Sequence, residues 1–177
     1  MEKLIITGGK KLGGEISVHG SKNAVLPIMA SALLIKGETV LHNVPNLSDV
    51  EASANILRRL GARVERKAST LIIDASSVTG NTIPEEMMRE MRSSIIFLGS
   101  LLSRCGEAWL CPPGGCDIGI RPIDLHISSL KKLGAQITEN GNCICCRAVK
   151  LRGAKVFLSF PSVGATENII LAAVCAS

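Results

Sequence analysis

The sequence predicts an α/β domain made of repeated βαβαββ units with helices packed inside. Residues 57–64, LRRLGARV, return 73 residues later as residues 130–137, LKKLGAQI, and each copy leads into a hairpin-like pair of apolar segments. The stretches that start near Asn23, Met87 and Gly164 are apolar nearly all round, as helices buried between sheets are. The repeat and the apolar helices together indicate this fold class.

The first repeat is expected to begin with short strands at residues 4–6 and 13–18. A helix follows from about Asn23, because Pro27 fits a helix only near its first turn. Gly37 ends that helix. The elements predicted beyond it are a strand at 39–43, a helix capped by Ser48 or Asp49 that runs to Leu60, and a hairpin of strands 63–66 and 71–74.

The second repeat follows the same order. The helices near Asp49 and Asp124 carry basic residues, and we expect both to face water. Residues 151–156 resemble residues 12–17 and are interpreted as the start of a third repeat. The apolar helix of that repeat shows no end signal before Ser177. We therefore expect the chain to be cut short.

The composition is typical of a globular protein with a mildly cationic surface. Of the 177 residues, 46% are hydrophobic, which is enough for a domain with a real core. The excess of 20 Lys and Arg over 15 Asp and Glu is spread along the chain and suits small anionic ligands. Few residues are aromatic, so a stacking surface for nucleic acid is not expected. Without a signal-peptide pattern or an apolar run of ~18 residues, we expect a cytoplasmic protein with no membrane partner.

The seven cysteines do not show the pattern of a disulfide framework. Their number is odd, and in the cytosol we expect no disulfide. A metal site formed by Cys111, Cys116 and His126 is disfavoured, because the gap between the two thiols is loose for zinc ligands. We expect no metal and no cofactor. The remaining cysteines are interpreted as small buried hydrophobic side chains: Cys105, Cys143, Cys145, Cys146 and Cys175.

Residues 111–125, CPPGGCDIGIRPIDL, form the candidate site. Prolines and glycines exclude regular structure here, so Cys116 stands on a loop and Asp124 opens the next helix. Arg121 lies between them, held extended by Pro122. Because a nearby guanidinium favours a thiolate, Cys116 is a candidate reactive thiol. The alternative is an ordinary loop cysteine.

Five separated motifs carry a family resemblance: Ser21–Ala24, Met91–Ser94, Pro113–Gly119, Arg121–His126 and Pro161–Thr166. Together they closely resemble the UDP-N-acetylglucosamine 1-carboxyvinyltransferases of the enolpyruvyl transferase family, over all 177 residues. The resemblance implies inside-out α/β barrel domains of βαβαββ repeats around buried helices, with substrates bound between two domains. Residues 1–21 would be strands of a mostly absent second domain. Residues 22–177 would be the first domain, incomplete at its C-terminus, so that the chain is the N-terminal portion of a family member.

The resemblance also implies a reaction. The enolpyruvyl group of phosphoenolpyruvate moves to the 3′-hydroxyl of UDP-N-acetylglucosamine and phosphate leaves, in the first committed step of peptidoglycan synthesis. The protein would then be a cytoplasmic transferase of cell wall biogenesis, cell shape and cell division, and a fosfomycin target. The catalytic residues implied are Cys116 as general acid, Lys22 and Arg121.

The substrate contacts implied by the resemblance fall into three groups. Lys22, Arg92 and Arg121 would bind the phosphate and carboxylate of phosphoenolpyruvate, and Asn23 the sugar and the intermediate. The uridine stretch would be Arg121, Pro122, Ile123, Asp124 and Leu125, and the diphosphate turn would be Ser162, Val163 and Gly164.

Read without the resemblance, these residues have plainer roles. Lys22 is then a solvated lysine, and Asn23 and Asp124 are helix caps. His126 and Glu167 are interpreted as structural in either case.

The sequence departs from the family pattern in two respects. Phe160-Pro161 stands where some members carry a lysine, so one cationic contact to the diphosphate is expected to be missing. The general-base aspartate and a further arginine would come from the second domain, so we expect this chain alone to be inactive. The alternative is a non-catalytic nucleotide-sugar-binding fragment or regulatory module. The Pro-Gly-Gly-Cys loop and the Arg-Pro-Ile-Asp-Leu stretch disfavour the related transferase that acts on shikimate phosphate.

Overall fold

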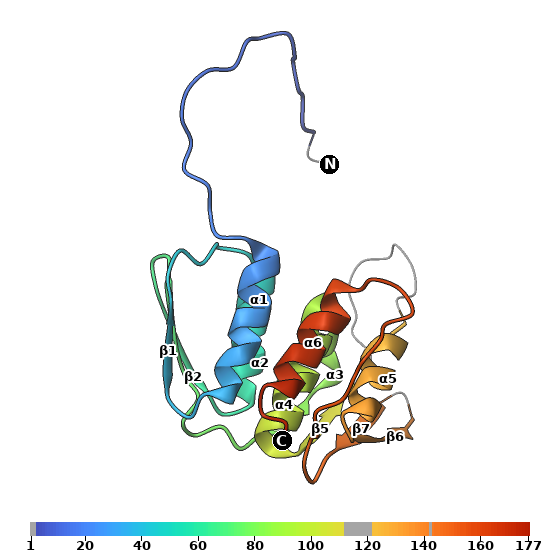
Figure 1. The fold of residues 1–177 in the computed structure, drawn as a ribbon. Coiled ribbons are helices and arrows are strands. Elements are labelled where there is room, and N and C mark those ends of the chain that lie inside the picture. The colour runs from blue at the N-terminus through green and yellow to red at the C-terminus, as the bar shows by residue number, and fades with distance from the viewer. Residues whose placement is uncertain (1–2, 112–121, 142) are drawn as a thin grey trace.

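A computed structural model describes residues 3–111, 122–141 and 143–177 (Figure 1). Its first half is one βαββ-like unit in which three strands form an antiparallel sheet of order β1-β3-β2. The elements of this unit are α1 (Lys22–Ser31), the 3₁₀ turn η1 (Ala32–Leu34), β1 (Glu38–Leu41), α2 (Ser48–Arg59), β2 (Arg63–Lys67) and β3 (Thr70–Asp74).

The second half repeats this plan with one more strand. Its sheet has the order β4-β5-β7-β6, with β4 parallel to β5 and the other pairs antiparallel. Its elements are β4 (Thr82–Ile83), α3 (Glu85–Glu90), the 3₁₀ turn η2 (Arg92–Ile96), α4 (Phe97–Cys105), β5 (Glu107–Leu110), α5 (Asp124–Lys132), β6 (Gln136–Asn140) and β7 (Cys143–Arg147). The helix α6 (Val163–Ala173) follows.

The predicted internal repeat is confirmed. Strands β6 and β7 begin 73 residues after β2 and β3, and in each sheet the later strand of the hairpin lies in the interior position. The turn from helix to hairpin is the same in both halves, because Gly61 and Gly134 adopt the left-handed conformation, with φ of 104° and 95°.

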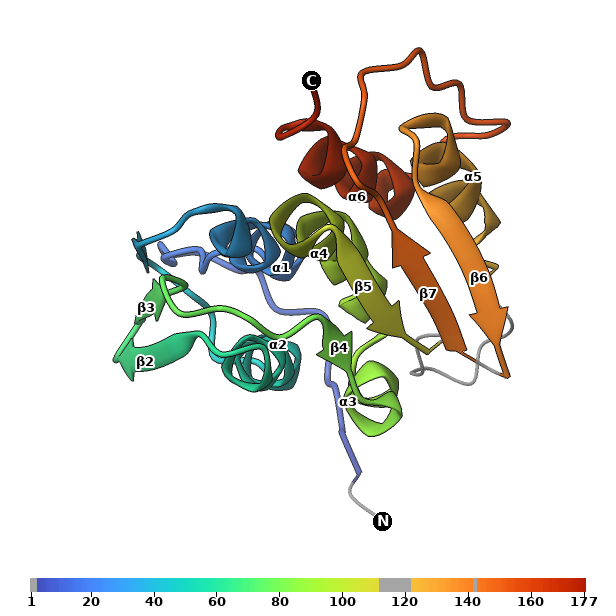
Figure 2. The same cartoon turned by 90° about the horizontal axis from the view of Figure 1, so that it is seen from below.

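The predicted arrangement of helices inside and sheets outside is also confirmed. Figure 2 shows α1, α4 and α6 side by side, with strands on both flanks. The central helix α4 is the most deeply buried, since Phe97, Leu98 and Leu101 are wholly inaccessible to water. Burying such side chains contributes about 1.5–3 kcal/mol each, so α4 is a main source of core stability. The basic residues at the ends of α2 and α5 are exposed, as predicted.

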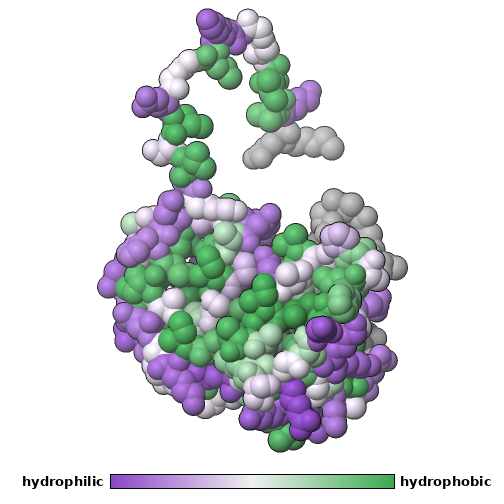
Figure 3. All heavy atoms as spheres, in the orientation of Figure 1, coloured by the Kyte–Doolittle hydropathy of each residue, from purple (hydrophilic) through white to green (hydrophobic). Residues whose placement is uncertain are grey.

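Helices α1 and α6 keep apolar side chains at the surface. Their sequences are apolar nearly all round, yet Ile28 in α1, Ile170 in α6 and Val174 directly after α6 are exposed. Figure 3 shows apolar residues gathered over the face on which these two helices lie. Complete burial therefore does not hold for α1 or α6. The helix predicted from near Met87 is divided into α3, η2 and α4, of which α4 is buried except for its last three residues. In the described part of the chain, no helix combines the length and the apolar character that crossing a membrane requires.

The strands predicted at residues 4–6 and 13–18 are wrong for this structure. Residues 3–20 contain no strand and extend away from the domain as an arm (Figure 1). Leu4, Ile5 and Ile6 are all more than four-fifths exposed. The physical reason is that the arm has no neighbouring strand with which to form a ladder, and a lone hairpin is only marginally stable in water. Residues 151–156 likewise form no strand.

The predicted helix caps also need correction. The N-cap positions of α2 and α5 are Leu47 and Ile123, and neither helix start has a side-chain cap. Ser48 and Asp124 are instead the first residues of their helices. An acidic side chain in a first turn still interacts favourably with the helix dipole, so Asp124 keeps a stabilising role.

Candidate active site

The predicted site residues that the structure describes lie at the starts of helices. Lys22 and Asn23 begin α1, Asp124 and Leu125 begin α5, and Ser162 to Gly164 begin α6. The N-terminal ends of α1 and α6 lie at the same end of the molecule (Figure 1). Free N–H groups and helix dipoles make such ends attractive to anions. The arrangement therefore suits a phosphorylated ligand.

The start of α6 is held by Ser162. Its Oγ accepts a hydrogen bond from the Ala165 N–H at 3.3 Å, and its carbonyl accepts one from the Thr166 N–H at 3.0 Å and one from the Thr166 hydroxyl at 2.7 Å. No acceptor for the N–H groups of Val163 and Gly164 occurs among the described residues. Val163 is exposed, so these two donors can reach a ligand.

The starts of α5 and α6 are joined by a buried polar contact. The Asn168 amide nitrogen in α6 lies 2.9 Å from Nδ1 of His126 in α5. The same imidazole lies 3.7 Å from the point where a Cβ on Gly164 would stand, and burial lowers the pKa of His126. The predicted uridine stretch and the predicted diphosphate turn are thereby brought together. Sequence reasoning missed Asn168, although a lone amide within an apolar helix is a signal for a buried polar partner.

Lys22 forms an ion pair with Asp49, which lies in the first turn of α2. Lys22 is half exposed, so the pair is accessible to solvent and to ligands. Asn23 is exposed. The sequence pattern gives either Ser48 or Asp49 as a helix cap and does not predict this ion pair, because nothing local shows that α1 and α2 pack side by side.

Other predicted site residues are seen only in part. Cys116 and Arg121 lie outside the described residues, and of Arg92 only the backbone is described, at the start of η2. Pro122 is exposed, and Ile123 is half-buried. Their roles remain predictions.

Cys111 and Cys143 form a disulfide, so the expectation of no disulfide is wrong. The antiparallel strands β5 and β7 pair Leu110 with Ile144. Cys111, which follows Leu110, therefore lies opposite Cys143, which precedes Ile144, and their Cα atoms are 3.9 Å apart. A metal site that uses the Cys111 thiol is therefore not formed. Sequence reasoning could not find this pair because it depends on the register between strands.

The other cysteines vary in exposure. Cys145 and Cys146 are buried as predicted, Cys105 is half-buried and Cys175 is exposed, so the interpretation of Cys175 as a buried residue is wrong. Burial raises the pKa of the Cys105 and Cys145 thiols, and that of Cys146 to about 12. These three thiols are therefore poor nucleophiles at neutral pH.

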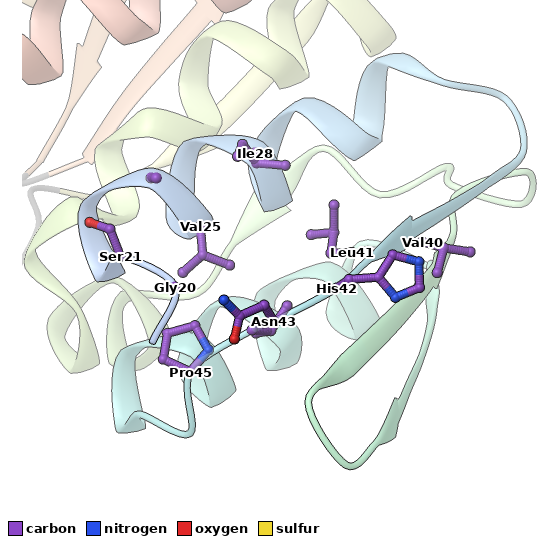
Figure 4. A pocket seen from close by; sticks show the side chains of 11 residues that line it. Gly20, Ser21, Val25, Ile28, Val40, Leu41, His42, Asn43 and Pro45 are labelled. Atoms are coloured by element: carbon purple, nitrogen blue, oxygen red, sulfur yellow. The ribbon is translucent and has the colours of Figure 1, made fainter. Parts of the chain in front are cut away.

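A groove of about 220 Å³ runs between α1 and β1, and Gly20, Ser21 and Ala24 at the start of α1 are part of its lining. Val25 and Ile28 face it from α1, and Val40 and Leu41 from β1 (Figure 4). Its lining is largely apolar and does not include Lys22 or Asn23. It therefore does not form the candidate anion site.

Comparisons with known proteins agree on one family. The sequence profile of EPSP synthase (3-phosphoshikimate 1-carboxyvinyltransferase) matches residues 6–177. A UDP-N-acetylglucosamine 1-carboxyvinyltransferase 2 from Caldanaerobacter subterraneus is 49% identical over 99% of this chain and 42% of its own length. A UDP-N-acetylglucosamine 1-carboxyvinyltransferase from Chloroherpeton thalassium is 51% identical over 99% of this chain and 42% of its own length. The chain thus spans about two fifths of the length of these relatives.

Solved structures show the same fold. The enolpyruvyl transferase NikO from Streptomyces tendae superposes with a TM-score of 0.77 at 20% identity, covering 96% of this chain and 40% of NikO. EPSP synthase from Acinetobacter baumannii gives 0.73 at 20% identity, covering 92% of this chain and 38% of that protein. These similarities concern the fold alone, in which helices lie inside and sheets lie outside.

Proposed function

Because this chain belongs to the EPSP synthase (3-phosphoshikimate 1-carboxyvinyltransferase) family, we propose that its helix starts bind UDP-N-acetylglucosamine and phosphoenolpyruvate for enolpyruvyl transfer. The observation that carries the proposal is the meeting of α5 and α6, which joins the predicted uridine stretch to the predicted diphosphate turn. Relatives with about half of their residues identical over this whole chain are named for the UDP-sugar rather than for shikimate phosphate, which favours that substrate.

The proposed chemistry has two balanced steps. Cys116 gives its proton to the vinyl carbon of phosphoenolpyruvate while the 3′-oxygen of the sugar bonds to the neighbouring carbon and loses its own proton to a base. The tetrahedral ketal then loses phosphate, and one proton leaves the new methyl group to restore the double bond. Lys22, Arg92 and Arg121 would stabilise the phosphate and carboxylate charges. Asn23 would hold the sugar and the ketal.

The UDP part of UDP-N-acetylglucosamine would bind at the starts of α5 and α6. The free N–H groups of Val163 and Gly164 would bind the diphosphate, and Asp124 would accept a hydrogen bond from the uracil ring. Backbone groups of residues 122–125 would complete the uridine contact. Lys22 would exchange its contact with Asp49 for one with the anionic substrate.

This assignment would place the protein at the first committed step of peptidoglycan synthesis, as a fosfomycin target acting in the cytoplasm. We propose that residues 22–177 belong to the first domain of such an enzyme, and that residues 1–21 belong to the second. The general-base aspartate and a further arginine would come from that second domain. We therefore expect no steady turnover from these 177 residues alone.

Titration calorimetry of the 177-residue chain tests the proposal. UDP-N-acetylglucosamine should bind, and shikimate 3-phosphate should bind far more weakly. Asp124→Asn should weaken UDP-N-acetylglucosamine binding roughly 10-fold or more, because it removes a charged acceptor. Glu86→Gln is the matched control, since Glu86 is also an exposed acidic residue in a first helical turn, and it should bind as the original chain does. Preference for shikimate 3-phosphate, or equal loss in both variants, would contradict the proposal.

A further inference from the structure

The end of α5 and the segment after β7 bring together cations that stand apart in the sequence. Two hydrogen bonds hold the two stretches side by side: the Arg152 N–H donates to the Leu133 carbonyl at 2.9 Å, and Nζ of Lys132 donates to the Phe157 carbonyl at 3.4 Å. The cations gathered there are all exposed. We call this patch the basic surface, and its members are Lys131, Lys132, Lys150, Arg152 and Lys155.

The charge of the basic surface is largely unbalanced. In the part of the chain that the structure describes, none of its five members forms an ion pair. Between residues 125 and 166 the sequence has one acidic side chain, Glu139 in β6. Glu107 is paired with Arg147, and the Ser177 carboxylate, beside the Gly153 N–H, offsets a single charge. Such a surface has a positive potential, which attracts a partner with many negative charges.

Two exposed apolar side chains stand among these cations. Val149 directly precedes Lys150 and is fully exposed, and Phe157, whose carbonyl contacts Lys132, is 77% exposed. At an anionic lipid surface, cations bind the headgroup phosphates while apolar side chains enter the boundary with the acyl chains. A nucleic acid would use the cations and leave Val149 and Phe157 in water. A lipid surface is therefore the partner that uses the whole patch.

The basic surface lies away from the candidate active site. It occupies the last turn of α5, whereas Asp124 is in the first turn. The turn after β7 lies at the end of the molecule opposite the starts of α1 and α6 (Figure 1). A flat partner can therefore contact the basic surface and leave those helix starts open.

We propose that the basic surface binds peripherally to an anionic phospholipid membrane, with its cations on the headgroup phosphates and with Val149 and Phe157 at the acyl boundary. This inference does not depend on the proposed function. It adds a partner that the sequence did not predict, because the expectation of no membrane partner was based on the lack of an apolar span, and a peripheral contact needs no span.

A pair of double variants tests the position of the charges. Lys150→Gln/Arg152→Gln removes two cations from the basic surface. Lys36→Gln/Arg59→Gln is the matched control, since it removes one exposed lysine and one exposed arginine from the first half of the chain and gives the same net charge. All four side chains are exposed, so both double variants should fold, and circular dichroism checks this.

The measurement is sedimentation of the 177-residue chain with vesicles of phosphatidylglycerol and phosphatidylcholine, and with vesicles of phosphatidylcholine alone. The chain should bind the anionic vesicles, and added salt should weaken the binding. Lys150→Gln/Arg152→Gln should lose roughly 25-fold in affinity, about 5-fold for each cation. The control should lose far less. Equal losses in the two double variants, or equal binding to both kinds of vesicle, would overturn the inference.

Phe157→Ala distinguishes a lipid partner from other polyanions. It leaves the net charge unchanged, and it should weaken vesicle binding roughly 3- to 10-fold because it removes apolar area from the lipid contact. Vesicle binding that Phe157→Ala does not alter would contradict the lipid contact. A chain that binds duplex DNA or a poly-glutamate peptide but no vesicles would also overturn it. Titration with UDP-N-acetylglucosamine keeps the two proposals apart, because Lys150→Gln/Arg152→Gln should bind the sugar nucleotide as the original chain does.

Discussion

Among single residues, Gly99 decides how closely α4 and α6 can pack. A Cβ at this position would clash with the backbone oxygen of Asn168 and would stand 2.5 Å from its Oδ1. Real Cβ atoms do not approach other atoms so closely, and both neighbours belong to a rigid helix. The glycine is therefore required by the helix contact, and the same contact allows its N–H to reach Asn168.

We predict that Gly99→Ala destabilises the protein by about 1–3 kcal/mol, because the added methyl group forces α4 and α6 apart. Gly37→Ala is the control, since the nearest atom to its Cβ would be Ile35 Cγ2 at 3.9 Å. It should change the free energy of unfolding by less than about 0.5 kcal/mol. Urea unfolding followed by circular dichroism measures both. Equal stability of the two variants would contradict the packing account.

Sequence reasoning at this scale located candidate residues but not their partners. Lys22 is a candidate only through the family resemblance, and its pairing with Asp49 depends on how α1 and α2 pack. His126 was interpreted as structural because its neighbours Asn168 and Gly164 lie about 40 residues further along the chain. Contacts of this kind are tertiary, and local patterns do not contain them.

At the scale of elements, the paired strands β5 and β7 are cross-linked at one end by the Cys111–Cys143 disulfide. Their antiparallel register brings Cys111 opposite Cys143 and closes a loop across 32 residues. That loop includes the predicted catalytic segment and α5. Closing this loop lowers the conformational entropy of the unfolded chain far more than that of the folded chain, so the disulfide stabilises the fold.

We predict that reducing this disulfide lowers the free energy of unfolding by about 3–4 kcal/mol, the loss of loop-closure entropy expected for a loop of this length. The measurement is the urea midpoint with and without a phosphine reductant. Cys111→Ser should be insensitive to the reductant, while Cys175→Ser, which alters an exposed free thiol, should respond as the original chain does. An unchanged midpoint in the original chain on reduction would contradict this prediction.

Most helices and the two hairpins could be predicted from the sequence, and the arm could not. The repeat of residues 57–64 fixes where both hairpins begin, because a helix that ends in a left-handed glycine must turn back in the same way each time. The apolar pattern of residues 4–6 and 13–18 predicts strands equally well. A strand also needs a neighbour, and the sequence pattern alone does not show whether one is present.

Across the whole molecule, apolar surface occurs at the groove beside β1 and on the helices α1 and α6. The second sheet has four strands and the first has three, and no strand among the described residues pairs with the outer edge of β1. The groove of Figure 4 runs along that edge. Helices α1 and α6 also carry exposed apolar side chains, and Figure 3 shows apolar residues gathered on the face where these helices lie.

The proposed function rests on a match along the whole chain more than on any one motif. Composition and charge indicate only a ligand class, small anions. The family follows from several motifs in a fixed order, and the fold then brings the starts of α5 and α6 together. Which helix ends meet is set by the layered packing, so the geometry of the site could not be predicted from the spacing of its residues.

The central claim is that this chain holds a reactive Cys116 beside a UDP-sugar site, and mass spectrometry after treatment with fosfomycin tests it most directly. A thiolate should open the epoxide, and the new alkoxide should take up a proton. Cys105, Cys145 and Cys146 should stay unlabelled because burial raises the pKa of each, and exposed Cys175 serves as an internal control for non-specific labelling. We predict an adduct confined to Cys116 and promoted by UDP-N-acetylglucosamine. No adduct at Cys116, or an adduct at Cys116 that forms no faster than one at Cys175 and that the sugar does not promote, would contradict the claim.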